Sequence, residues 1–121
     1  MITHKKTEQF GELSLIDFMY TLKNEPASVL VLITVGYLDG DTETQKDLLD
    51  KMEGYLGHIQ SPEFKKDYPQ DKIYLDVVLQ EVPNQLILRL LYKCIPWCEE
   101  CGATLRIMLQ GEYIHLRETE D

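Results

Sequence analysis

Three cysteines within residues 94–101 are the side chains of this sequence with the widest chemical capacity. Two thiols separated by two residues can exchange with a disulfide, or they can supply half of a zinc site. A full zinc site here would take Cys94, Cys98 and Cys101, with His115 as a remote fourth ligand. A strong zinc pattern has a second closely spaced pair, which this chain lacks. A thiol-redox or zinc-binding protein is therefore the alternative hypothesis and not the leading one.

The segment around Cys98 and Cys101 reads Trp-Cys-Glu-Glu-Cys-Gly and resembles the Trp-Cys-x-x-Cys sequence of thioredoxin-like oxidoreductases. Their chemistry needs a thiolate at a helix N-terminus directly after a strand, where the helix dipole stabilises it. This pair lies instead at the C-terminal end of a predicted helix, and Glu99 and Glu100 add like charge. Both effects disfavour a thiolate, which predicts that these cysteines are small packing residues.

Other catalytic motifs are missing from the sequence. There is no Gly-x-Ser-x-Gly elbow for a nucleophilic serine, no Gly-Lys-Ser or Gly-Lys-Thr phosphate loop, and no Gly-x-Gly-x-x-Gly. His4, His58 and His115 fall in three separate predicted contexts. We therefore expect no catalytic residues and no cofactor, and the prediction leans towards a protein that is not an enzyme.

The net charge limits the kinds of molecule that this protein is expected to bind. With 21 acidic and 12 basic side chains among 121 residues, the chain carries a net charge of −9. Nucleic acid and anionic membranes are bound through clustered Lys and Arg, so neither is expected as a partner. An acidic protein suits a basic protein partner, because opposite charge speeds the encounter, although the same charge also serves solubility alone.

Length and cysteine usage predict one cytoplasmic domain. We expect a flexible N-terminal segment over residues 1–12, a single α/β domain over 13–117 and an acidic tail over 118–121. The first segment is polar and lacks the apolar core of a secretory signal. No run approaches the roughly 18 to 20 apolar residues of a membrane span. Cysteines that are odd in number and crowded together make no disulfide framework, which favours a reducing cytoplasm.

Two helices are predicted from apolar periodicity and end signals. Apolar side chains recur at helical spacing over 42–60, and Ser61-Pro62 ends that helix. A charged connector follows over 63–71. The second helix begins after Asn84 and closes at Gly102, a residue suited to the left-handed conformation after a helix. Pro96 lies inside this second helix and is expected to kink or divide it.

Strands are predicted before, between and after these helices. Residues 28–38 are apolar on both faces and indicate a central strand. The segment 13–22 is expected to form a hairpin with this strand, with an amphipathic helix over 11–22 as the alternative. Two further strands and a terminal edge strand are expected over 72–82, 104–109 and 112–117.

The element order is therefore ββαβαβ with an added C-terminal edge strand. Two strand–helix–strand units imply parallel pairing through right-handed crossovers. If both crossovers progress in the same direction, both helices fall on one face of a mixed sheet. The predicted fold class is α/β, arranged as an α+β-like two-layer sandwich.

Part of this pattern resembles a family of small, uncharacterised bacterial α/β proteins. The residues that carry the resemblance lie in the first helix and its connector: Leu49, Lys51, Tyr55, Leu56, Ile59, Ser61, Glu63, Tyr68 and Pro69. Ile16-Asp17 matches the start of the family's hairpin, and Gly102 matches the glycine that closes its second helix. The resemblance implies a hairpin–helix–strand–helix–strand fold over roughly residues 15–109, and it implies no activity.

The sheet face opposite the helices is the predicted binding surface. With Val29 and Val31 taken to face the helices, the predicted partner-binding residues are Leu30, Leu32, Tyr74, Asp76, Val78, Arg106 and Met108. Aromatic and aliphatic area of this kind, with a potential Asp76–Arg106 ion pair, is unusual on a face left in water. A protein partner, a homodimer mate or the chain's own N-terminal segment could cover it.

The leading hypothesis is a small acidic protein that binds another protein and is not an enzyme. Its support is the acidic charge, the small size and the apolar face. An immunity or antitoxin protein that blocks a basic enzyme is the particular role that this class suggests.

Overall fold

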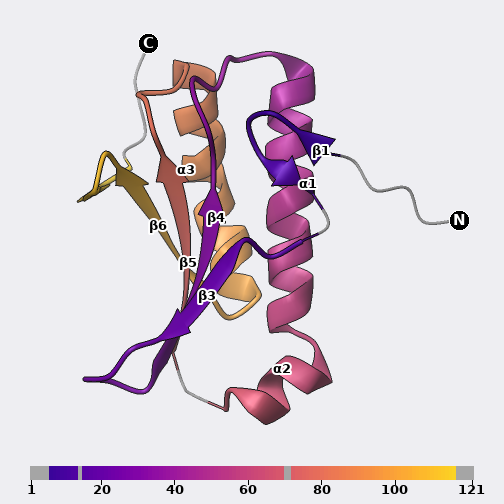
Figure 1. Ribbon diagram of the computed structural model, residues 1–121, viewed down its shortest axis with the longest axis vertical. Coiled ribbons are helices and arrows are strands. Elements are labelled where there is room, and N and C mark those ends of the chain that lie inside the picture. Colours follow the sequence, from indigo (N-terminus) through magenta and orange to yellow (C-terminus); the bar gives the residue numbers. More distant parts are fainter. Residues whose placement is uncertain (1–5, 14, 70–71, 117–121) are drawn as a thin grey trace, which may run out of the picture.

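A mixed five-stranded sheet forms one layer of the protein (Figure 1). The computed structural model describes residues 6–13, 15–69 and 72–116. The strands of the sheet are β3 (Phe18–Thr21), β4 (Ala27–Ile33), β5 (Lys72–Leu79), β6 (Thr104–Leu109) and β7 (Glu112–Ile114). They lie in the order β3–β4–β5–β6–β7, with β4, β5 and β6 parallel and both edge strands antiparallel to their neighbours.

Helices form the second layer. They are α1 (Thr42–Ile59), α2 (Pro62–Asp67) and α3 (Gln85–Glu100). Figure 1 shows α1 and α3 on the same side of the sheet. Their buried side chains share one core cluster with one face of β4, β5 and β6. The predicted α/β two-layer fold is therefore confirmed, and so is the hairpin in place of a first helix, since β3 pairs with β4.

The short helix α2 lies where the sequence predicted only the end of a helix and a connector. Ser61 Oγ accepts a hydrogen bond from the Phe64 backbone N–H at 3.2 Å, and Pro62 occupies the first turn. Serine as N-cap followed by proline at N1 is a helix start signal as well as a stop. Phe64 is buried in the main core, so this turn closes one end of the α1 layer.

The end of α3 agrees with the predicted role of Gly102. Its φ is 91°, and its N–H donates to the Glu99 carbonyl while the Ala103 N–H donates to the Cys98 carbonyl. This paired closure satisfies carbonyls that the last helical turn leaves open. The helix runs from Gln85 to Glu100 as one element that contains Pro96, so of the predicted kink or division near Lys93 the division is wrong.

Strand register decides which face of the sheet each side chain joins. In β4 and β5, Leu30 lies opposite Leu75 and Leu32 lies opposite Val77. Residues that are directly opposite each other on neighbouring strands point to the same face. All four are fully buried and belong to the core that the helices cover, together with Ile107 of β6.

The predicted orientation of β4 is consequently wrong. Leu30 and Leu32 pack beneath the helices, and Val29, Val31 and Ile33 take the opposite face beside Tyr74, Asp76 and Val78. A strand that is apolar on both sides gives no alternation to orient it, so only the register with β5 determines its faces.

The described part of the N-terminal segment is packed on the domain. Its two short strands, β1 (Lys6–Thr7) and β2 (Gly11–Glu12), pair with each other and lie beside α1 (Figure 1). Phe10 and Leu13 are buried in the same core as the helices, and the Val35 N–H donates to the Gln9 carbonyl at 2.8 Å. Phe10 thus extends the folded domain upstream of residue 13, the predicted start.

A buried polar cluster holds this segment in place. The fully buried Lys51 of α1 donates to the Phe10 carbonyl and pairs with Asp17 Oδ1 at 2.7 Å. Asp17 Oδ2 accepts from the Ile33 N–H at 2.9 Å. Tyr55 donates to the Val31 carbonyl at 2.6 Å and accepts from the Asp17 N–H at 2.7 Å. Asp17 and Tyr55 thus provide hydrogen-bond partners for the Ile33 N–H and the Val31 carbonyl, two backbone groups of β4 next to the end of its pairing with β3.

We expect the Tyr55→Phe variant to lower the free energy of unfolding by about 1 to 3 kcal/mol, because the buried Val31 carbonyl and the partly buried Asp17 N–H each lose their partner. Burial is the largest cause of the raised pKa of Tyr55, and this agrees with a hydroxyl that stays neutral inside the protein. Urea denaturation of the full chain measures the change. Tyr68→Phe is the matched control, since its ring packs on Phe64 with 5.1 Å between centroids, and it should change stability by less than about 0.5 kcal/mol. Equal effects of the two variants would contradict this role of Tyr55.

Candidate protein-binding surface

The sheet has a second face that points away from α1 and α3, which we call the open face. It is built from alternate residues of all five strands. By register its members are Phe18, Tyr20, Ala27, Val29, Val31, Ile33, Lys72, Tyr74, Asp76, Val78, Thr104, Arg106, Met108 and Tyr113. No helix among the described residues contributes to the small core cluster on this face, which contains Val29, Val31 and Tyr74.

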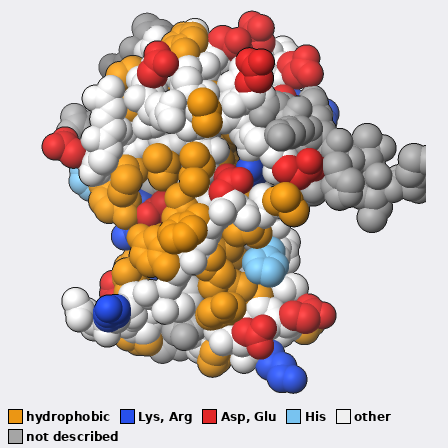
Figure 2. Space-filling model, in the orientation of Figure 1, with side chains coloured by type: hydrophobic (Ala, Val, Ile, Leu, Met, Phe, Trp, Pro, Cys, Tyr) orange, Lys and Arg blue, Asp and Glu red, His pale blue; other side chains and the backbone are white. Residues whose placement is uncertain are grey.

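Large hydrophobic side chains are exposed on the open face. The structure describes nine exposed large hydrophobic residues, and four of them belong to the open face, namely Phe18, Tyr20, Ile33 and Tyr113, with exposed fractions between 37% and 54%. The rings of Phe18 and Tyr20 lie side by side with 5.8 Å between their centroids. Figure 2 shows hydrophobic side chains gathered over the strands of the sheet. Aromatic area of this kind on one face is typical of a surface that meets another molecule.

An ion pair lies in the middle of this apolar area. Arg106 Nε donates to Asp76 Oδ1 at 2.7 Å, and Arg106 Nη2 donates to Asp76 Oδ2 at 2.9 Å. The hydroxyl of Tyr113 donates to the same Oδ2 at 2.8 Å. Asp76 is only 2% exposed, so three hydrogen bonds compensate a carboxylate that water hardly reaches.

Aromatic rings fix the guanidinium of Arg106 from its faces. Its Cζ lies 3.8 Å from the centroid of Tyr74 and 4.5 Å from the centroid of Tyr113. A guanidinium over an aromatic face gains from the ring quadrupole. The Arg106 side chain is still 26% exposed, so one part of it reaches the surface.

The electrostatics of the cluster favour a neutral Tyr113 and a charged Arg106. Burial and the hydrogen bond to Asp76 raise the pKa of Tyr113 to about 12, which keeps the phenol neutral at physiological pH. Burial lowers the pKa of Arg106, but the hydrogen bond and charge of Asp76 outweigh it and raise that pKa overall. The cluster is therefore a neutral unit made of one fixed cation and one fixed anion.

The cysteines of α3 lie on the other side of the molecule, in the helix layer. Cys94 and Cys98 are buried in the main core, whereas Cys101 is half-buried. Burial raises the pKa of Cys94 to about 11. Burial, reinforced by Cys94, Cys101 and Glu99, raises the pKa of Cys98 to about 12. Neither of these two thiols is poised as a thiolate, which the redox hypothesis needs.

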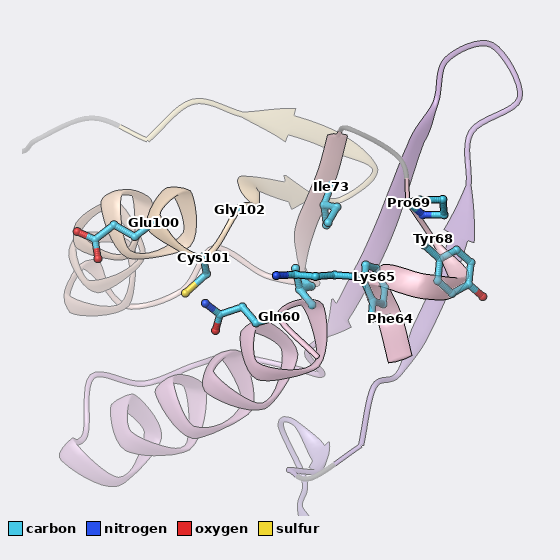
Figure 3. Close-up of a pocket in the computed structure, with 10 residues that line it drawn as sticks. Gln60, Phe64, Lys65, Tyr68, Pro69, Ile73, Glu100, Cys101 and Gly102 are labelled. Carbon is cyan, nitrogen blue, oxygen red and sulfur yellow. The ribbon is translucent and has the colours of Figure 1, made fainter. Parts of the chain in front are cut away.

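Cys101 faces a pocket of about 430 Å³ between the ends of α1, α2 and α3. In Figure 3 the side chains of Cys101 and Gln60 point toward each other, and Glu100 points away. Apolar side chains line the other side of the pocket, including Ile59, Phe64 and Ile73. The pocket explains why this thiol is reachable while its two neighbours in the sequence are not.

The sequence-level zinc alternative is not assembled within the described residues. Among them, no three His, Cys, Asp or Glu side chains are grouped so as to hold a metal ion, which leaves His115 apart from the cysteines of α3. Among those same residues, no helix has the length and apolar character to cross a membrane.

Comparisons with protein-family models, with curated proteins and with solved structures found no match to this chain. The family resemblance noted from the sequence stays a prediction.

The sequence identified the central residues of the open face but not the exposed aromatic residues of its edge strands, which we call the aromatic rim. Tyr74, Asp76, Val78, Arg106 and Met108 share this face as predicted. Three exposed aromatic residues of the edge strands were missed: Phe18, Tyr20 and Tyr113. Their alternation along the hairpin and along the last strand was the available signal, and the uncertainty between strand and helix over 11–22 obscured it for the first two.

We expect Asp76→Ala to destabilise the protein by about 1 to 3 kcal/mol, because the partly buried Arg106 loses its counter-ion and Tyr113 loses its acceptor. Asp50→Ala is the matched control, since Asp50 pairs with Lys46 at 2.7 Å on the exposed side of α1. That surface pair should contribute less than about 0.5 kcal/mol. Chemical denaturation of the two variants provides the comparison, and similar losses would show that the Asp76 pair is as solvated as the surface one.

A thiol reagent applied to the native protein at pH 8 should modify Cys101 quickly and leave Cys94 and Cys98 unmodified. Their raised pKa values keep both buried thiols protonated at this pH, and the helix layer covers them. Mass spectrometry after the reaction counts the labels, and all three cysteines should react once the chain is denatured. The Cys101→Ser variant should show no fast label. Rapid native labelling of Cys98 would revive the redox hypothesis.

Proposed function

We propose that this protein binds a positively charged protein through its open face, without catalysing a reaction. The observation that carries the proposal is the composition of that face. Exposed aromatic side chains from the edge strands surround an ion pair that is already neutralised within the chain. Aromatic residues and Arg are enriched at the centres of protein–protein interfaces, whereas unpaired charges are depleted there.

The net charge of −9 supports a basic partner over a second copy of the chain. Two copies would repel each other over a long range, while a basic protein would be steered towards the complex. The described N-terminal residues do not compete for the open face, because Phe10 and Leu13 are buried on the helix side. The three free cysteines suit an encounter in the reducing cytoplasm.

An immunity or antitoxin protein is the particular role that we suggest within this class. Such proteins mask a basic enzyme by surface complementarity, and a small acidic domain with an apolar face is suited to that task. Co-expression of the chain with its isolated partner would test the suggestion: growth protection that depends on Phe18 and Tyr20 supports it.

The binding proposal is tested by capture from native cells with three forms of the full chain. The wild type is compared with Phe18→Ser/Tyr20→Ser, which alters the open face at exposed positions. The matched control is Tyr37→Ser/Val82→Ser, which removes two exposed hydrophobic side chains outside the strands. We expect one basic protein to be retained in equimolar amount by the wild type and the control. Its retention by the open-face variant should fall at least about tenfold.

Two further measurements decide what covers the open face. Binding of the retained protein should weaken as salt rises, because part of the encounter is electrostatic. Hydrogen exchange should slow at β3, β6 and β7 in the complex. Equal capture by all three forms, or a wild-type homodimer that protects these strands in the absence of other proteins, would contradict the proposal.

A further inference from the structure

The guanidinium of Arg106 has one edge that forms no hydrogen bond with the residues that the structure describes. A guanidinium carries five N–H donors in a rigid plane. Asp76 takes the Nε–H and one Nη2–H. Within the part of the chain that the structure describes, no other acceptor bonds to this group. Both Nη1–H donors and the second Nη2–H therefore have no acceptor among the described residues.

The unused edge is held in a fixed position. Asp76 accepts two hydrogen bonds from the opposite edge. The ring centroids of Tyr74 and Tyr113 lie 3.8 and 4.5 Å from Cζ. The Tyr113 hydroxyl in turn locks the carboxylate at 2.8 Å. An exposed arginine ordinarily loses much side-chain freedom when it binds, and this one has lost it already. Its donors are pre-organised at the centre of an apolar face.

We propose that this free edge of Arg106 is the anchor of the open face and that it binds main-chain carbonyl oxygens of the protein partner. The inference rests on the proposed binding function and specifies the chemical group that the site accepts. A partner that covers the aromatic rim excludes water from Arg106, so the three remaining donors then need acceptors from the partner.

Charge balance selects a carbonyl over a carboxylate. Asp76 already neutralises Arg106, and a second carboxylate would add an uncompensated negative charge beside an acid that is only 2% exposed. A main-chain carbonyl accepts the same hydrogen bonds and leaves the cluster neutral. A partner with an excess of positive charge also has fewer carboxylates to offer.

The test uses the purified protein that the wild type retains in the capture experiment, with its dissociation constant measured by calorimetry. Arg106→Lys keeps the positive charge but loses the planar fork, and we expect binding to weaken by about 10- to 100-fold. Arg89→Lys, the same exchange in the helix layer, should stay within about twofold. Thermal melts confirm that both variants are folded before binding is measured.

A spectroscopic readout separates anchoring from a structural role. In the complex, the Nη1 proton signals of Arg106 should be protected from exchange with water, and in the free protein they should exchange rapidly. Asp76→Asn distinguishes the two acceptors, because it leaves Arg106 with a net positive charge. With a carbonyl acceptor this variant binds more weakly, since Arg106 is held less firmly. With a carboxylate acceptor it binds more tightly, which would overturn the assignment.

Different binding results would contradict this inference and the proposed function. If Phe18→Ser/Tyr20→Ser abolishes binding while Arg106→Lys leaves the dissociation constant unchanged, the open face binds a partner without this anchor. If no protein depends on the open face at all, both the anchor and the proposed function are overturned.

Discussion

The two-sided character of this protein depends on one constraint, the pairing register of its three parallel strands. Opposite pairs such as Leu30–Leu75 and Leu75–Leu105 direct leucines to the side where the crossover helices return. The same register places Asp76 opposite Arg106 on the other side. A shift by one residue would exchange the two sets, burying the charges beneath the helices and exposing the leucines. The core and the candidate site are therefore fixed together.

A second interaction keeps the open face uncovered by the described N-terminal residues. The buried Lys51 reaches the Phe10 carbonyl and Asp17, and Tyr55 bridges Asp17 to the edge of β4. Lys51 is fully buried while the Asp17 side chain is 20% exposed, so loss of Asp17 would leave the Lys51 charge desolvated and without its counter-ion. The chain thus uses α1 to draw these residues to the helix side, and the aromatic rim of β3 stays exposed.

Much of the fold could be predicted from the sequence because its signals are local. The apolar period over 42–60, the closing Gly102 and the alternation around Ile107 each determine an element from a few neighbouring residues. The facing of β4 could not be predicted in this way, because Val29 to Leu32 are apolar on both sides. The centre of the open face was identified from strands that alternate clearly. Its rim depended on the hairpin, where strand and helix patterns overlapped, and the short helix after Ser61 was missed because Ser-Pro marks both an end and a beginning.

The most direct test of this account is hydroxyl-radical footprinting of the full chain, alone and with its retained partner. Ring oxidation at Phe18, Tyr20 and Tyr113 reports on the open face, and Tyr37 in the loop after β4 serves as the internal reference. The account predicts fast oxidation of the three rings in the free monomer and strong protection of them in the complex, with Tyr37 as the less affected site. Protection of all three rings in the isolated monomer would contradict it, because the chain itself would then cover the surface assigned to a partner.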